Sequence, residues 1–387
     1  MSVIRLPRAN RGIEPYQLHG PKDFPATAQG PFNRLAFAAA HVVHDRLAEH
    51  DPWLDVAIDW EGTLAYRRHL WGLGFAVAEA MDTAQRGMGL DWATALELIR
   101  RSVADARHVP GAVVYSGAGT DHLAPTPGRT VEEVIAAYEE QVAAVEGTGG
   151  RIILMASRAL AAAAEGPEDY VRVYGRILGQ VREPVIIHWL GEMFDPALAG
   201  YWGSPDHWQA METCLEILGT NAARIDGIKI SLLSSEKEIA MRRRLPAGIR
   251  MYTGDDFNYA ELIAGDEQGY SDALLGIFDA IAPAASAAFT ALAKGDQERF
   301  FEILEPTIPL SRYIFKAPTR FYKTGVVFMA WLNGHQPHFT MVGGQESGRS
   351  VLHLAELFRL ADRAGLLRDP DLAVGRMRRL LAVHGID

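Results

Sequence analysis

Residues 184–191 read Pro-Val-Ile-Ile-His-Trp-Leu-Gly, and this stretch decides the class of fold. A strand through residues 185–187 carries apolar side chains at consecutive positions, so both of its faces are apolar. The same pattern recurs at residues 151–156, which read Arg-Ile-Ile-Leu-Met-Ala. Strands that are buried on both faces are typical of a parallel sheet covered by helices, because helices then exclude water from each face. The two stretches therefore predict an α/β fold.

Six further strand-like segments alternate with helical patterns along the chain. Residues 130–146 open with Thr130 followed by Glu133, the spacing of a capping box, and residues 167–181 place a proline at a helix start. A total of eight strands with intervening helices predicts a closed (β/α)8 barrel (a TIM barrel), and an open doubly wound sheet is the rival. A dinucleotide-binding sheet requires Gly-x-Gly-x-x-Gly after its first strand, and the sequence lacks it there. The other expected strands are residues 35–43, 76–80, 112–116, 227–232, 249–253 and 271–278.

The two ends of the chain differ from this alternating region. Residues 1–33 contain five prolines and few apolar runs, which indicates an irregular N-terminal arm. Strand signals stop after about Ala280, and helical patterns follow. We therefore expect the barrel to occupy residues 34–280 and a C-terminal helical bundle to occupy residues 281–387.

Composition narrows the class of protein. The 387 residues include 38 Lys plus Arg and 48 Asp plus Glu, a net charge of -10, which disfavours binding to nucleic acid or to anionic lipid. Hydrophobic residues make up 48% of the chain, which suffices for a large core. The single cysteine, Cys214, excludes an internal disulfide and a zinc–thiolate cluster. With no signal-peptide pattern and no apolar run long enough for a membrane span, we expect a soluble, cytoplasmic protein.

Lys229 is the strongest candidate for chemistry. Residues 224–231 read Arg-Ile-Asp-Gly-Ile-Lys-Ile-Ser and place this lysine on a strand among apolar neighbours. Burial there disfavours the ammonium form, lowers the pKa and yields a nucleophilic amine that forms a Schiff base with a carbonyl substrate. The alternative is a structural lysine that reaches solvent or pairs with Asp255 or Asp256, and position alone leaves both interpretations open.

Three segments share their order and spacing with a known enzyme group. Gly227-Ile228-Lys229, Gly254-Asp255-Asp256 and the stretch from Ala273 to Gly295 resemble the dihydrodipicolinate synthase and N-acetylneuraminate lyase superfamily, in a divergent and little-characterised branch. The resemblance implies a (β/α)8 barrel with a helical tail and class I aldolase chemistry through Lys229. It implies a small carbonyl substrate such as a 2-oxo acid or keto sugar, no metal or cofactor, and a homodimer or homotetramer.

The loop after the second strand departs from the superfamily. The superfamily has Gly-Thr-Thr-Gly-Glu there, whose threonines hold the carboxylate of a 2-oxo acid, whereas residues 82–86 read Asp-Thr-Ala-Gln-Arg. The resemblance assigns Thr83 the remaining hydroxyl that orients the substrate. Arg86 is a candidate for binding an anion bidentately from the same loop, and a surface salt bridge is the alternative.

The fifth strand departs as well. The superfamily ends it with a tyrosine that relays protons, and here His188 stands in that place. Imidazole titrates near neutral pH, so His188 is a candidate acid or base. Trp189 offers either an aromatic wall for the substrate or ordinary packing.

Strand ends supply the remaining candidates for substrate binding. Arg158 follows the fourth strand and is a candidate for a substrate carboxylate or phosphate. Tyr115 ends the third strand and either lines the cavity or packs in the core. Gly254 allows a close approach at the end of the seventh strand, and Asp255 orients a substrate hydroxyl or caps the next helix.

Two other functions remain open from the sequence. A metal-dependent sugar isomerase barrel requires carboxylate ligands at several strand ends, and Glu79, Asp82 and Asp255 are the candidates. A ligand-binding barrel without catalysis is the other, with Lys229 as a structural residue. The sequence does not select the substrate.

Overall fold

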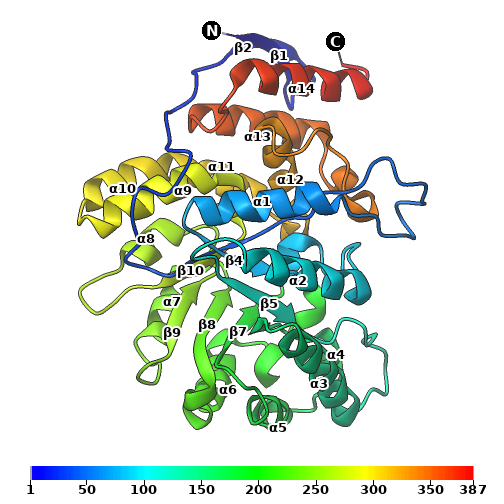
Figure 1. Ribbon diagram of the computed structural model, residues 1–387, viewed down its shortest axis with the longest axis vertical. Helices are drawn as coiled ribbons and strands as arrows, with labels where there is room; N and C mark the ends of the chain where they lie inside the picture. The colour runs from blue at the N-terminus through cyan, green and yellow to red at the C-terminus, as the bar shows by residue number, and fades with distance from the viewer. Residues whose placement is uncertain (1, 387) are drawn as a thin grey trace.

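The computed structural model describes residues 2–386 and contains a closed barrel of eight parallel strands (Figure 1). Going round the barrel, the order is β10-β3-β4-β5-β6-β7-β8-β9, so each strand lies beside its neighbour in sequence and the last closes on the first. The predicted (β/α)8 barrel is confirmed, and each expected strand overlaps an observed one. The strands are β3 (Ala36–Ala39), β4 (Ala76–Glu79), β5 (Val114–Ala118), β6 (Arg151–Leu154), β7 (Val185–Leu190), β8 (Ile225–Ser231), β9 (Arg250–Thr253) and β10 (Asp272–Leu275).

Helices follow the strands and cover the outside of the barrel. The capping box expected at Thr130 is present, with the Thr130 side chain accepting from the Glu133 N–H and the Glu133 carboxylate accepting from the Thr130 N–H. Within residues 2–386 no helix combines the length and apolar character needed to cross a bilayer. The helices of this region are α1 (Trp60–Gly72), α2 (Trp92–Ala106), α3 (Val131–Gly147), α4 (Arg158–Ala163), α5 (Pro167–Leu178), α6 (His207–Thr220), α7 (Ser235–Arg242), α8 (Tyr259–Ala264) and α9 (Ile277–Ala293).

Strand alternation divides the buried side chains into two cores. On β7 the side chain of Ile186 points into the barrel, whereas Val185 and Ile187 point outward to the helices. The inner core is small and lies within the ring of strands, and the outer core joins the strands to the helices. Members of the inner core are Phe37, Ala39, Ala78, Met81, Tyr115, Ile153, Met155, Ile186, Tyr252 and Leu274.

The C-terminal region forms a helical layer on one end of the barrel, as Figure 1 shows. Every residue of α12 is buried, because this helix packs against α9, α11, α13 and α14 and has no face toward water. This central position carries the first turn of α12 to the barrel. The helices of the layer are α10 (Gln297–Leu304), α11 (Ile308–Ile314), α12 (Tyr322–Leu332), α13 (Val351–Arg363) and α14 (Pro370–Val383).

The N-terminal arm is not irregular throughout, in contrast to the expectation from its prolines. The strands β1 (Val3–Pro7) and β2 (Ile13–Gln17) pair antiparallel and pack on α13 and α14, burying Ile4 and Leu6. A two-stranded ribbon tolerates proline, because each strand has one edge that needs no partner N–H. The two ends of the chain lie close together in Figure 1.

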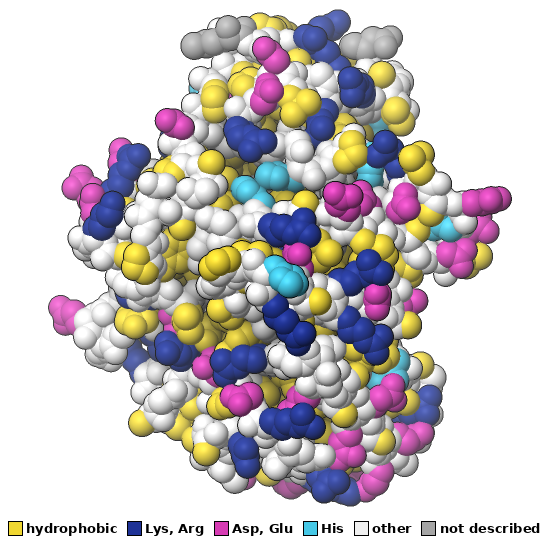
Figure 2. Space-filling model, in the orientation of Figure 1, with side chains coloured by type: hydrophobic (Ala, Val, Ile, Leu, Met, Phe, Trp, Pro, Cys, Tyr) yellow, Lys and Arg dark blue, Asp and Glu magenta, His cyan; other side chains and the backbone are white. Residues whose placement is uncertain are grey.

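Charges are mixed on the face of the molecule seen in Figure 2. Acidic and basic side chains are interspersed there, without an extended patch of either sign. This face therefore offers no single-sign surface to a polyanion.

Candidate active site

Lys229 lies on β8, in register between His188 on β7 and Tyr252 on β9. Its side chain is buried, with 8% of the residue exposed. Burial lowers the pKa of Lys229, and the carboxylates of Asp256 and Asp82 oppose that shift. Within residues 2–386 no hydrogen bond or ion pair ties down its Nζ. The amine is therefore buried, has no close partner in the described residues and loses its proton more readily than an exposed lysine does.

The Lys229 side chain faces a small cavity inside the mouth of the barrel. His188 and Thr83 line the same cavity, so the structure brings together the three residues that the sequence predicted as catalytic. The cavity also receives groups from outside the predicted set. Its polar lining consists of Asp82, Thr83, His188, Lys229, Ser231, Asp256 and Tyr322.

Gly254 makes room for the lysine. A Cβ atom at this position would lie 2.7 Å from Cε of Lys229 and closer still to Oγ of Ser231. We expected this glycine to admit a substrate or another backbone; the group that approaches it is the Lys229 side chain. Gly254 therefore acts by positioning the amine.

His188 is held as a neutral imidazole. Burial and the neighbouring Lys229 lower the pKa of His188 well below its usual value. Its Nε2 lies 3.2 Å from Oγ of Ser231, and its Nδ1 is buried without a hydrogen-bond partner in the described part of the chain. A neutral imidazole with one free ring nitrogen beside an amine is suited to accepting a proton.

Asp255 does not face the cavity, which corrects its predicted role in binding substrate. Its carboxylate accepts hydrogen bonds from the backbone N–H groups of Phe257 and Asn258 and from the Asn258 amide, and so shapes the loop after β9. The neighbouring carboxylate of Asp256 lines the cavity instead. Asp256 accepts from the Ile277 N–H at 2.8 Å, and burial raises its pKa to about 7. Of the Gly-Asp-Asp segment, the second aspartate is the one placed for chemistry.

Tyr322 reaches the cavity from the first turn of α12, in the C-terminal region. Its hydroxyl lies 2.8 Å from Oγ1 of Thr83, and burial raises its pKa. Sequence analysis missed Tyr322, because it expected the strand ends alone to supply the site and looked for a tyrosine at the end of the fifth strand. The sequence did contain an indication. The superfamily uses a tyrosine at the end of the fifth strand, and because His188 occupies that position here, a tyrosine from elsewhere in the chain was to be expected.

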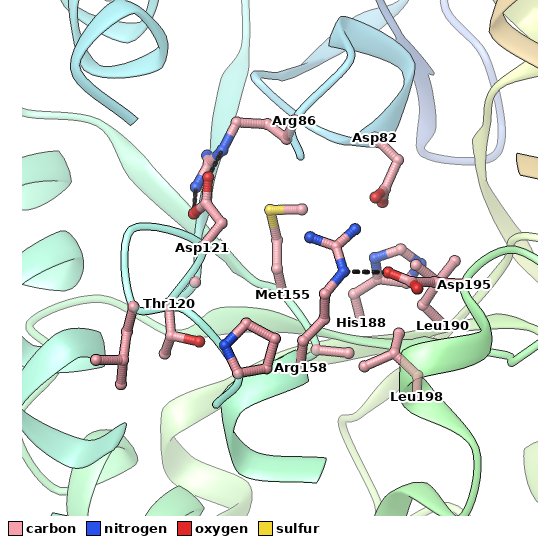
Figure 3. A pocket seen from close by; sticks show the side chains of 14 residues that line it. Asp82, Arg86, Thr120, Asp121, Met155, Arg158, His188, Leu190, Asp195 and Leu198 are labelled. Atoms are coloured by element: carbon pink, nitrogen blue, oxygen red, sulfur yellow. Dashed lines mark hydrogen bonds and ion pairs between the residues drawn. The ribbon is translucent and has the colours of Figure 1, made fainter. Parts of the chain in front are cut away.

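Arg86 is buried (2% exposed) and does not line the Lys229 cavity, although it lines a neighbouring hollow. Its Nε and Nη2 bond the two oxygens of Asp121, Nη1 donates to the carbonyl oxygens of Ala80 and Gly117, and Nη2 also donates to Gln141 (Figure 3). These bonds use all five N–H donors of a guanidinium. The Arg86 pair lowers the pKa of Asp121 to about 2. The ion pair offered as the alternative for Arg86 is present, but it is buried and not on the surface, and it joins the loop after β4 to the loop after β5.

Arg158 lies at the mouth, as predicted, and lines two hollows outside the Lys229 cavity. Its Nε donates to Asp195. Figure 3 shows the rest of its guanidinium projecting into the hollow that Thr120 and Met155 also line, with Asp82 opposite. The Arg158 guanidinium therefore keeps N–H groups directed toward open space at the carboxyl ends of the strands.

Trp189 and Tyr115 do not reach the cavity. Trp189 follows the inward-facing His188, so its side chain points outward, where it packs edge-on against Trp202 with ring centroids 6.1 Å apart. Tyr115 points into the barrel, where its ring packs against Phe37 in the inner core and the Arg151 guanidinium lies over it. Both residues are packing residues, which corrects their prediction as substrate contacts.

The three carboxylates proposed as metal ligands do not converge. Glu79 points outward and bonds Arg67 on α1 and Ser102 on α2, and Asp255 is engaged in its loop. Asp82 alone of the three lines the cavity. In residues 2–386 no group of three His, Cys, Asp or Glu side chains is arranged to hold a metal ion.

One family model and several solved structures match this chain. A family model described as "Protein of unknown function (DUF993)" matches residues 4–386. No curated protein matches the sequence.

Solved structures of dihydrodipicolinate synthases share the fold. The enzyme from Aquifex aeolicus has a TM-score of 0.63 at 14% identity, over 86% of this chain and 99% of its own. YagE from E. coli K12, a prophage protein of the dihydrodipicolinic acid synthase family solved in complex with pyruvate, has a TM-score of 0.67 at 13% identity, over 86% of this chain and 99% of its own. At this identity the likeness establishes a common fold, in agreement with the resemblance read from the sequence.

Proposed function

Because the chain belongs to the family described as protein of unknown function (DUF993), we propose its activity from its own cavity: a Schiff-base-forming lyase of the class I aldolase type. The observation that carries this proposal is the buried, unpaired amine of Lys229 facing a cavity with an imidazole, a carboxyl group and a pair of hydroxyls. The shared fold of dihydrodipicolinate synthases supports the proposal. The substrate is a small carbonyl compound, a 2-oxo acid or a keto-sugar-like molecule.

The first stage joins the substrate to the protein. The neutral amine of Lys229 attacks the carbonyl carbon, a C–N bond forms, and the nitrogen transfers a proton to the carbonyl oxygen to give a carbinolamine. Protonation of that hydroxyl and loss of water leave an iminium ion. We assign the delivery of this proton to the hydrogen-bonded hydroxyls of Thr83 and Tyr322, which line the cavity.

The second stage breaks or forms the bond between the α and β carbons of the iminium. In cleavage the β-hydroxyl loses its proton and becomes a carbonyl, the Cα–Cβ electron pair moves to the iminium, and the resulting enamine is protonated at carbon before water releases the product. In dehydration the α carbon loses a proton to give the enamine, which expels the protonated β-hydroxyl as water. His188, held neutral, accepts the proton that departs from the substrate and returns it to the enamine carbon. Cleavage, condensation and dehydration share this intermediate.

Asp256 sets the charge of the amine. With a pKa of about 7, its carboxyl group exchanges a proton near neutral pH, and its ionised form favours the ammonium form of Lys229. Asp256 therefore couples the reactivity of Lys229 to pH.

We infer the setting of the enzyme from the resemblance: a soluble, cytoplasmic homodimer or homotetramer that needs no metal or cofactor. Light scattering on the purified protein measures the oligomeric state. Full turnover in the presence of a chelator is the expected result for the cofactor, and a requirement for added divalent metal would favour an isomerase.

Borohydride trapping tests the central proposal. The protein is incubated with a panel of 2-oxo acids, keto sugars and simple ketones, reduced with borohydride and mapped by peptide mass spectrometry. We expect a reduced adduct on Lys229, its loss in Lys229→Arg, and its retention in Lys294→Arg, which alters an exposed lysine. Absence of an adduct with every carbonyl compound would contradict the proposal and favour a ligand-binding barrel.

A further inference from the structure

Lys323 is a buried cation without an ion pair. It follows Tyr322 in the first turn of α12 and is 4% exposed. Its Nζ lies 3.3 Å from Sδ of Met88 and 3.2 Å from the carbonyl oxygen of Arg320, and no carboxylate of residues 2–386 comes within ion-pair distance. A buried ammonium group is costly unless an anion or several acceptors compensate it. The Tyr322 ring, whose centroid lies 4.8 Å from Nζ, adds a cation–π contact, but no anion of the described residues pairs with the ammonium group.

The ammonium group faces a hollow of about 650 Å³ outside the Lys229 cavity. Arg158 and Arg320 also line this hollow, together with the carboxylates of Asp82 and Asp195. Three formal positive charges therefore face two negative ones, which leaves an excess of one positive charge. A single negative charge, such as one carboxylate, balances the hollow, whereas a phosphate monoester dianion would leave excess negative charge beside two carboxylates.

The backbone around the hollow is fitted to the Arg158 guanidinium. Gly87 has a φ of +70°, and a Cβ atom there would collide with Nη1 of Arg158. A side chain at position 87 would thus displace the guanidinium from the hollow. Of its three nitrogens, Nε is bonded to Asp195, and the terminal nitrogens have no hydrogen bond within the described residues.

The hollow adjoins the catalytic cavity but is distinct from it. Asp82, Phe194 and Tyr322 line both, whereas Lys229 lines only the inner cavity and Lys323 only the outer hollow. A molecule that reaches both lysines must therefore carry its anion away from its reacting carbonyl.

We propose that the outer hollow is an anion subsite, in which Lys323, Arg158 and Arg320 hold a substrate carboxylate that is separated from the carbonyl attacked by Lys229. This inference rests on the proposed function and narrows its substrate class to keto acids with a remote carboxylate. Burial lowers the pKa of Lys323 to about 8, so the amine is still mostly charged at pH 7. The internal bonding of Arg86 is consistent with this assignment, because it removes the other cation expected to bind the anion.

Matched pairs of ketones test the subsite. Levulinate and its homologues lengthened by one and by two methylene groups are each compared with their methyl esters, by the concentration that gives half-maximal trapping on Lys229. For at least one chain length we expect a tenfold or greater preference for the acid. Lys323→Gln should weaken trapping of the acids far more than trapping of the esters and so remove the preference, and Lys294→Gln, at an exposed lysine, should leave the preference intact.

Binding of pentanoate, which lacks the carbonyl, separates this proposal from the proposed function. Calorimetric binding that requires Lys323 but not Lys229, without any adduct on Lys229, would sustain the subsite and overturn the Schiff-base chemistry. Equal trapping of acids and esters by the unmodified protein and by Lys323→Gln would overturn the subsite and sustain the chemistry. An adduct that maps to Lys323 would overturn the assignment of this lysine to anion binding.

A second variant tests the subsite independently, in case Lys323→Gln does not fold. Arg320 is exposed on the rim, and Arg320→Gln should weaken trapping of the acids by about threefold or more without affecting the esters. No change in this variant, combined with a Lys323→Gln protein that unfolds at a lower temperature, would overturn the subsite, since Lys323 would then be required for folding alone.

Discussion

Thr83 and Tyr322 stand 239 residues apart in the chain, and their hydroxyl oxygens lie 2.8 Å apart in the structure. The first belongs to the 3₁₀ turn after β4, and the second belongs to the first turn of α12. The cavity of Lys229 is thus closed by a residue from outside the barrel. The C-terminal helices are part of the proposed catalytic site as well as a covering layer.

Removal of the Tyr322 hydroxyl tests its role as a proton donor. In Tyr322→Phe we expect imine formation on Lys229 to slow by about 10²-fold, because loss of water from the carbinolamine would lack its acid. The final extent of borohydride trapping should stay the same, since the amine itself is intact. Quenched-flow trapping measures the rate, and Tyr313→Phe on α11 is the matched control. An unchanged rate in Tyr322→Phe would assign the proton to another group.

Gly254→Ala should slow the reaction of Lys229 with carbonyl compounds, although the lysine itself is not substituted. The new methyl group would overlap Cε of Lys229 and the carbonyl oxygen of Ile230, each 2.7 Å away. We expect a loss of about 1–3 kcal/mol in the free energy of unfolding and at least a tenfold slower trapping of Lys229. Gly219→Ala, on α6 with open space around it, is the control and should be neutral or stabilising. Trapping at the normal rate in Gly254→Ala would show that the lysine does not need this space.

Asp256→Asn should move the pH dependence of trapping. The Asp256 carboxylate favours the ammonium form of Lys229, as does the carboxylate of Asp82. With a neutral amide at position 256, the lysine loses its proton at lower pH, so the acid limb of the trapping profile shifts to lower pH. The Asn side chain can still accept from the Ile277 N–H. A shift to higher pH would contradict the electrostatic argument.

Glu238→Gln should stabilise the protein at alkaline pH. Burial raises the pKa of Glu238 to about 8, although Ser271 donates a hydrogen bond to its Oε1 at 2.7 Å. The folded state holds this carboxyl group protonated, whereas the unfolded chain ionises it near 4.5, the ordinary pKa of a glutamate side chain. The stability it contributes is therefore complete below pH 4.5 and is lost as the pH rises through about 8.

A glutamine at position 238 is neutral throughout this range. Between pH 5 and pH 9 we expect Glu238→Gln to gain about 4 kcal/mol relative to the unmodified protein. Urea unfolding at both pH values measures the difference, with Glu236→Gln, an exposed residue of the same helix, as the control. Parallel pH dependences would mean that Glu238 is ionised in the folded protein.

Arg86→Gln should act on stability. Because it leaves the partly buried Asp121 carboxylate without its cation, we expect the free energy of unfolding to fall by about 3–5 kcal/mol. The exposed Arg100→Gln should change it by less than about 0.5 kcal/mol. A stable Arg86→Gln protein with weakened substrate binding would restore the anion-binding role.

The sequence predicted the barrel well because local patterns determine it. Runs such as residues 151–154 and 185–187 are apolar on both faces, and this property follows from the burial of each strand between the inner core and the helices. The hairpin β1–β2 was missed because prolines outweighed the alternation of Val3, Ile4, Arg5 and Leu6, which is visible once the pairing is known.

The residues of the candidate site that lie within a single strand could be predicted from the sequence. Lys229 and His188 follow from the alternation of β8 and β7, and the same rule should have excluded Trp189, which must point the other way. The absence of the expected tyrosine from the fifth strand indicated that another tyrosine was needed, but the positions of Tyr322 and Lys323 could not be predicted, because they depend on the packing of α12 against distant helices. Arg86 was misjudged since its partner Asp121 comes from another loop, and sequence spacing does not reveal such pairs.

The anchoring of Tyr322 in a helix buried on all sides has a consequence for biosynthesis. During synthesis on a ribosome, all eight strands leave the exit tunnel before α12 does. The hydroxyl of Tyr322 therefore joins the cavity only after the barrel strands have been made, when α12 docks among its neighbouring helices.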